Sequence, residues 1–139
     1  MRIMGLDYGS KTVGVAMTDP LGITVQPLET ILRKEENKLR RTYARIEELV
    51  KEYDVKLIVV GLPLNMDDSL GERGILCQEF STNIERRTGI KTVMQDERLT
   101  TVESDDILEE CGVKASDRKK YIDQLAAVLI LRDYLYSLK

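Results

Sequence analysis

The first third of the chain alternates short apolar runs with turn residues. Residues 2–7 are largely apolar and lead into Tyr8-Gly9-Ser10-Lys11, which predicts a buried strand followed by a turn. A second strand is expected at residues 12–18. A third is expected at residues 23–31, where Pro27 indicates a sheet edge or a bulge. Three consecutive strands joined by tight turns predict an antiparallel meander.

The pattern then changes to a helical period. Apolar residues recur at three- and four-residue spacing over residues 36–53, which predicts an amphipathic helix. Residues 55–60 form a nearly continuous, β-branched apolar run typical of a central strand, which the following Gly-Leu-Pro is expected to end. A second helix is expected over residues 75–87, terminated by Gly89, and a fifth strand over residues 90–95.

Two further helices are predicted in the last third of the chain. Thr100 and Glu103 match a capping box at a helix start, and Gly112 is expected to end that helix. The last helix is expected from residue 116 or 117 to about residue 138. This element order predicts one domain over residues 1–139, of the α/β class, with a mixed five-stranded sheet and helices on both faces.

Composition excludes several function classes. The chain has 139 residues, 42% hydrophobic and 32% charged, which is the composition of a soluble globular domain. No apolar run approaches the ~18 residues of a membrane span, and Asp7 interrupts the place of a signal-peptide core. Cys77 and Cys111 lack metal-ligand spacing and are expected as buried thiols. A cytoplasmic protein with no membrane partner is therefore expected.

Charge and the absence of histidine narrow the chemistry. Without histidine, Ser-His-Asp and Cys-His mechanisms are excluded, so catalysis must rest on carboxylates, lysines, hydroxyls or a bound ion. The net charge of -3 argues against coating nucleic acid through bulk positive charge but is compatible with a nuclease. Each basic cluster, at residues 33–45, 86–87 and 114–120, is more simply a solvated surface.

Two carboxylates follow the ends of predicted strands. Asp7 closes the first strand, on the same face as Ile3 and Gly5, where the crevice of α/β enzymes usually opens. A carboxylate that continues an apolar face is costly unless a cation or a hydrogen-bond donor meets it. Glu97 follows the fifth strand, and alternation favours it over Asp96 as the residue that faces the same site.

A third carboxylate lies on the packing face of the last helix. Asp123 shares one helical stripe with Ala126, Ala127 and Ile130, and the two alanines let the helix approach the sheet closely. Three such acids would repel one another by about 4 kcal/mol per pair at ~4 Å, which a divalent cation would resolve. Oxygen ligands suit Mg²⁺ or Mn²⁺, and two such ions can clamp an in-line phosphoryl displacement.

Each acid also has an ordinary structural interpretation. Asp7 could accept hydrogen bonds in a turn, and Glu97 could favour a helix N-terminus. Asp123 could pair with Arg118 or Lys119. Only the joint placement of the three acids favours the catalytic interpretation.

Four motifs, in this order and covering essentially the whole chain, resemble a known family. They are Gly5-Leu6-Asp7-Tyr8-Gly9-Ser10-Lys11 continuing to Gly14-Val15-Ala16, Gly61-Leu62-Pro63-Leu64-Asn65-Met66-Asp67, Asp96-Glu97-Arg98-Leu99-Thr100-Thr101 and Asp123-Gln124-Leu125-Ala126-Ala127. The chain resembles the YqgF (RuvX) family, which is Holliday-junction-resolvase-like, is described as a pre-16S ribosomal RNA nuclease, and is cytoplasmic. The resemblance implies a ribonuclease H-like fold and a hydrolase that acts on phosphodiester bonds in ribosome biogenesis.

The resemblance also implies roles for single residues. This chain departs from the family at Asp68, where glycine is frequent, in the loop that contains Asn65 and Asp67. The implied ligands of Mg²⁺ or Mn²⁺, and catalytic residues, are Asp7, Glu97 and Asp123, and the implied phosphate- or substrate-binding residues are Lys11, Asn65 and Arg98.

Three other functions are compatible with the same residues. One is a resolvase of branched DNA, and another is a non-catalytic RNA-binding factor in ribosome assembly. The third is a phosphotransferase, because the turn at residues 7–11 also resembles the phosphate-gripping turn of actin-like and sugar kinases. A single domain of 139 residues disfavours the third, since those enzymes enclose ATP between two domains. A homodimer is compatible with each function.

Overall fold

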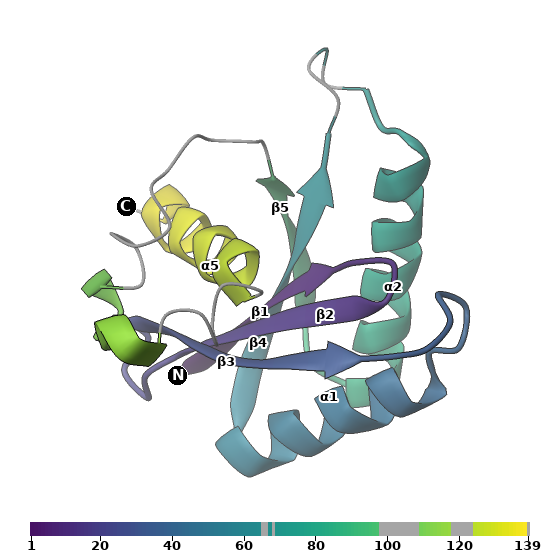
Figure 1. Ribbon diagram of the computed structural model, residues 1–139. Helices are drawn as coiled ribbons and strands as arrows, with labels where there is room; N and C mark the ends of the chain where they lie inside the picture. The colour runs from purple at the N-terminus through teal and green to yellow at the C-terminus, as the bar shows by residue number, and fades with distance from the viewer. Residues whose placement is uncertain (65–66, 68, 98–108, 118–123, 139) are drawn as a thin grey trace.

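The computed structural model describes residues 1–64, 67, 69–97, 109–117 and 124–138, with only the backbone of Glu97 (Figure 1). Its strands are β1 (Arg2–Tyr8), β2 (Thr12–Thr18), β3 (Val25–Leu32), β4 (Val55–Pro63) and β5 (Thr92–Glu97). Its helices are α1 (Arg40–Tyr53), α2 (Glu72–Thr88), the 3₁₀ turn η1 (Ala115–Asp117) and α5 (Leu125–Ser137).

The five strands form one mixed sheet in the order β3-β2-β1-β4-β5. β1 pairs antiparallel with β2 and β2 with β3, while β4 runs parallel to β1 and β5 parallel to β4. The antiparallel meander and the mixed sheet are therefore confirmed. β3 is an edge strand, and its pairing skips one residue beside Pro27, so both expectations from this proline are correct.

Alternation along β1 divides the core between the two faces of the sheet. Met4, Leu6 and Tyr8 belong to the apolar cluster beneath α1 and α2, which includes Phe80. Ile3 belongs to the second cluster, which packs against α5. Helices therefore cover both faces, as predicted, with α1 and α2 on one side and α5 on the other (Figure 1).

Several element bounds differ from the prediction. α1 begins at Arg40 rather than near residue 36, because Glu36 is held by Arg33, whose Nε donates to the Glu36 carbonyl. β4 does not stop at Gly61 but continues to Pro63, since its last residues pair with β5. β5 ends at Glu97, two residues beyond the predicted end.

The ends of the other helices can be compared in part. α2 begins at Glu72, three residues early, and ends as predicted at Gly89, which has a φ of 71° and donates to the Glu85 carbonyl. Gly112 has a φ of 81° and follows a helical turn, as expected. The capping box at residues 100–103 lies outside the described residues.

The predicted start of the last α-helix at residue 116 or 117 is wrong, because both residues belong to the 3₁₀ turn η1, and the described α-helix begins at Leu125. No helix in the described ranges is long and apolar enough to cross a membrane. Cys77 and Cys111 are buried and form no disulfide, as expected for buried thiols.

Candidate active site at the end of the first strand

Asp7 lies between two glycines of the neighbouring strands. In β2 its pairing partner is Gly14, and in β4 the pairing of Leu6 with Val60 brings Gly61 to its other side. Residues paired across a sheet point to the same face, so neither neighbour places a side chain beside the Asp7 carboxylate. Asp7 is partly buried. The result is a partly buried carboxylate at the end of a central strand, with no side chain from either paired neighbour beside it.

The same row of the sheet anchors the start of α5. Gly14 pairs with Thr30 of β3, and Thr30 accepts a hydrogen bond of 2.6 Å from Nε2 of Gln124. Thr30 is two strands from Asp7, which corresponds to about 10 Å. Gln124 is buried at 5% exposure, so this anchor is fixed. Asp123, the next residue toward the N-terminus, lies outside the described residues.

Gly5 brings α5 directly against β1. A Cβ atom at this position would lie 3.0 Å from the Ala127 carbonyl oxygen and 3.0 Å from Cβ of Leu131. Only glycine leaves room for the helix at this distance. The close approach expected between the last helix and the sheet is present, and it depends on the sheet residue as well as on Ala127.

The other predicted site residues are described only in part. Gly61, the neighbour of Asp7 in β4, pairs with Gln95 of β5. Glu97 is two residues farther along β5 and pairs with Pro63, so its backbone lies about 7 Å along the strand direction from the level of Asp7. Lys11 is exposed in the turn between β1 and β2. Asn65 and Arg98 lie outside the described residues. Among the side chains that are described, no three acids, cysteines or histidines form a group that could hold a metal ion, so the acidic triad stays a prediction.

Burial and one nearby cation set the electrostatics of Asp7. Loss of water raises the pKa of the Asp7 carboxyl above its ordinary value of 3.8, and the positive charge of Arg73 opposes this rise. A carboxylate in such a position gains from a cation that replaces the lost water.

Two arginines surround the next residue, Tyr8. The guanidinium carbons of Arg33 and Arg73 lie 4.8 Å and 4.9 Å from the centre of the Tyr8 ring. The sequence analysis did not identify Arg73 as a site residue, and it interpreted Arg33 only as part of a solvated basic cluster. No local pattern could have identified Arg73, because it is 65 residues from Tyr8.

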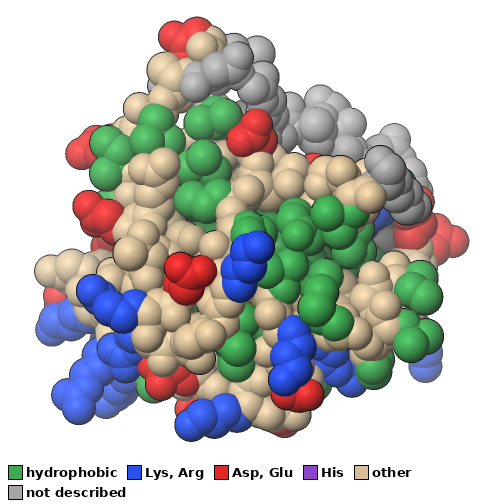
Figure 2. Space-filling view, turned by 180° about the vertical axis from the view of Figure 1, so that it is seen from behind, with side chains coloured by type: hydrophobic (Ala, Val, Ile, Leu, Met, Phe, Trp, Pro, Cys, Tyr) green, Lys and Arg blue, Asp and Glu red, His purple; other side chains and the backbone are tan. Residues whose placement is uncertain are grey.

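The visible face opposite Figure 1 carries both signs of charge. In Figure 2 the described Lys and Arg side chains lie mainly in the lower half, and acidic side chains reach the upper end, which in Figure 1 is the loop between β4 and α2. On this face, therefore, the described side chains form no continuous basic surface.

Comparison with known proteins gives a consistent picture. The model of the family RuvX, described as Holliday junction resolvase, matches residues 1–137. A protein of Lachnospira eligens named "Putative pre-16S rRNA nuclease" is 66% identical over 137 residues, which cover 99% of this chain and 98% of that protein. A Listeria monocytogenes protein of the same name is 50% identical over 135 residues, covering 97% of each.

Solved structures share the fold at low sequence identity. RuvC of T. thermophilus in complex with a Holliday junction substrate superposes with a TM-score of 0.66 at 14% identity, covering 99% of this chain and 96% of RuvC. The Fowlpox virus resolvase bound to Holliday junction DNA gives a TM-score of 0.58 at 12% identity, covering 99% of both chains. The expected ribonuclease H-like, resolvase-type fold is therefore confirmed.

Proposed function

The chain belongs to the RuvX family and is a nuclease, and we propose that it hydrolyses phosphodiester bonds of precursor 16S ribosomal RNA at the end of β1, with Mg²⁺ or Mn²⁺. The name shared by relatives that are 66% and 50% identical supports this substrate. Branched DNA is the substrate of the solved resolvases, but those share only 12–14% identity with this chain.

The observation that carries the proposal is the position of Asp7. It is the carboxylate at the end of the central strand, with Gly14 and Gly61 on either side leaving space for a ligand. The anchored start of α5, at Gln124, and the end of β5 lie at this same end of the sheet, which supports a shared site with Glu97 and with Asp123, the residue before Gln124 in the chain. An oxygen-only donor set fits a hard divalent cation.

Asp7, Glu97 and Asp123 would hold the cation in this proposal. When bound, the cation supplies a water of lowered pKa and neutralises charge that develops on the phosphate. The chain itself orients the substrate: Lys11, exposed in the turn after β1, donates to a phosphate oxygen, and Arg98 and Asn65 are assigned the same task.

Asp7→Asn tests the proposal. The variant should lose cleavage of a labelled precursor 16S RNA while keeping its fold, because asparagine retains the size and polarity of aspartate. Since burial raises the pKa of Asp7, the ionised carboxylate is disfavoured in the metal-free fold near neutral pH. The metal-free variant should therefore melt at the wild-type temperature or above it near pH 7, and this advantage should vanish below about pH 3.8, where both side chains are neutral.

Asp133→Asn is the matched control. Burial also raises the pKa of Asp133, but this residue lies on α5 eight positions beyond Leu125, about 12 Å along the helix. The Asp133→Asn variant should cleave the RNA at the wild-type rate. Cleavage by the wild-type protein should stop in excess EDTA. Cleavage by Asp7→Asn, or undiminished cleavage in EDTA, would remove the proposed site, and cleavage of a four-way DNA junction in preference to the RNA would replace the proposed substrate.

A further inference from the structure

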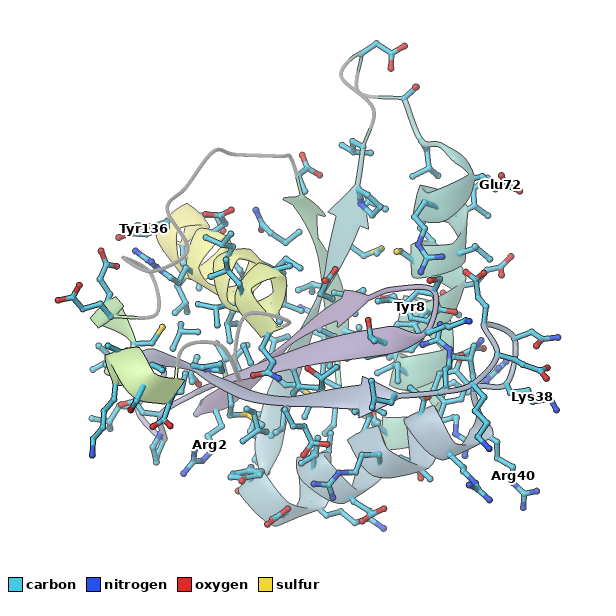
Figure 3. The ribbon with its side chains drawn as sticks, viewed as in Figure 1. Arg2, Tyr8, Lys38, Arg40, Glu72 and Tyr136 are labelled. Carbon is cyan, nitrogen blue, oxygen red and sulfur yellow. The ribbon has the colours of Figure 1, made fainter. Side chains whose placement is uncertain are left out.

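The ring of Tyr8, beside the proposed site, packs against two arginine side chains, Arg33 and Arg73. Phe80 stacks on it, with the ring centres 4.2 Å apart and the planes 10° from parallel. The guanidinium groups of Arg33 and Arg73 lie within 4.9 Å of the same ring centre. In Figure 3, Tyr8 is labelled beside the turn between β1 and β2, next to α2, which carries Phe80.

Both guanidinium groups are also fixed to the backbone that follows Asp7. Nη2 of Arg73 donates to the Tyr8 carbonyl at 2.9 Å, and Nη2 of Arg33 donates to the Gly9 carbonyl at 2.5 Å. Cation–π contact and these hydrogen bonds define the orientation of each planar group. The two charges are therefore held in place before any substrate arrives.

Among the described residues, one carboxylate forms an ion pair with this pair of arginines. Nη1 of Arg73 donates to Oε1 of Glu36, which lies between β3 and α1. Arg33 makes no ion pair with any described residue. The side chains of Arg73 and Glu36 are 36% and 46% exposed, so a solute can reach the pair. Arg73 is also close enough to Asp7 to act on its charge.

We propose that Arg73 binds a backbone phosphate of the nucleic-acid substrate, and that Glu36 occupies this position in the free protein. The inference rests on the proposed function, whose substrate it places along the start of α2. Nη1 of Arg73, which donates to a carboxylate oxygen of Glu36 in the free protein, can donate to a phosphate oxygen in its place. The ion pair between Arg73 and Glu36 is exposed to water and therefore weak, so a phosphate can displace the Glu36 carboxylate.

A second pair on the same helix is a matched control. Arg87, near the end of α2, bonds to Glu47 at 2.8 Å, and its guanidinium lies 5.2 Å from the centre of the Tyr43 ring. The chemistry is the same as at Arg73, with an arginine over a tyrosine and a glutamate partner. Fourteen residues separate the two arginines, which is about 21 Å along the helix and away from Asp7.

The experiment measures binding of a labelled single-stranded RNA by fluorescence anisotropy, in EDTA, at several KCl concentrations between about 50 and 200 mM. Arg73→Gln should weaken binding roughly tenfold, the loss expected for one charge-assisted hydrogen bond. The slope of log K against log salt should fall by about 0.7, which corresponds to one phosphate contact on a single strand. Glu36→Gln should tighten binding by up to about fivefold. Arg87→Gln and Glu47→Gln should leave affinity and slope unchanged.

Opposite effects of the two members of the pair distinguish binding from scaffolding. If the pair only holds the fold, Arg73→Gln and Glu36→Gln should weaken binding together, and this result would overturn the inference. Equal affinity and salt slope for Arg73→Gln and Arg87→Gln would also overturn it. Because Glu36→Gln is judged by a gain, misfolding cannot imitate the expected result. The binding assay does not depend on cleavage. Cleavage by Asp7→Asn would therefore refute the proposed function without deciding whether Arg73 binds a phosphate.

Discussion

Gly5→Ala adds one methyl group where α5 presses on β1. The new Cβ would lie 3.0 Å from the Ala127 carbonyl oxygen and from Cβ of Leu131. Neither atom can rotate away, because one belongs to the helix backbone and the other is the first atom of its side chain. Carbon atoms prefer separations of about 3.5–4.0 Å, so α5 must withdraw by about 0.5–1 Å.

Overpacking of this kind costs about 1–3 kcal/mol in the free energy of unfolding. Alanine offsets roughly 0.4–1 kcal/mol of this loss by restricting the unfolded chain. A net loss of about 1–2 kcal/mol should lower the melting temperature by about 4 °C per kcal/mol in a chain of this size. The cleavage rate should fall by more than the folded fraction does, because the displaced helix begins next to Asp123 in the chain.

Ile46→Val is the control for stability alone. Ile46 is fully buried on α1, on the opposite face of the sheet, and this substitution typically costs about 0.5–1.5 kcal/mol. Calorimetry and cleavage at a temperature well below both melting points should show similar destabilisation for the two variants but a slow rate only for Gly5→Ala. A Gly5→Ala protein that melts and cuts like the wild type would refute the argument that glycine is needed for the approach of α5.

Two further predictions concern loops. Lys11→Ala should slow cleavage or weaken substrate binding without changing the melting temperature, because Lys11 is exposed in the turn after β1; unchanged kinetics would assign this lysine to the surface only. Backbone hydrogen bonds from Thr24 and Ile23 lower the pKa of the Asp19 carboxyl, so its charge stabilises the fold above the ordinary pKa of 3.8, and this contribution is lost as pH falls through the lower folded-state value. Asp19→Asn should therefore melt below the wild type at pH 7, and the two melting curves should converge in acid.

Local pattern predicted the elements well and their ends less well. The second strand, residues 12–18, was predicted with its observed bounds because turns define both ends. The predicted start of α1 was wrong because the helical period extends to residue 36, whereas Glu36 is held outside the helix by two arginines. Arg33, three residues earlier, binds its carbonyl, and Arg73, 37 residues later, binds its carboxylate. The sequence Gly61-Leu62-Pro63 predicts the end of a strand, yet β4 includes Pro63 because its pairing with β5 continues to that residue.

The orientation of Asp7 was predictable because alternation along one strand determines it. The face of Asp7 follows from its spacing to Ile3 and Gly5, and the structure confirms that face through the packing of Gly5 against α5. Arg73 was not predictable, since its role depends on α2 crossing the end of β1, a contact between residues far apart in the sequence. Sequence pattern makes Asp7 and Asp123 candidates because they interrupt apolar stripes, whereas an arginine at an exposed helix start interrupts no such pattern.

Side chains alternate between the two faces of the sheet at the end of β1, and this alternation separates the residue proposed to bind a cation from the residues that carry positive charge. Consecutive residues point to opposite faces, so Asp7 faces α5 and Tyr8 faces α2, where its ring orders Arg33 and Arg73. If both cations lay on the face of Asp7, they would neutralise the carboxylate and compete with a metal ion. On the opposite face they only moderate its raised pKa, as Arg73 does. In the proposed function, a single strand end therefore offers the Asp7 carboxylate to a metal ion on one side and the Arg73 guanidinium to a phosphate on the other.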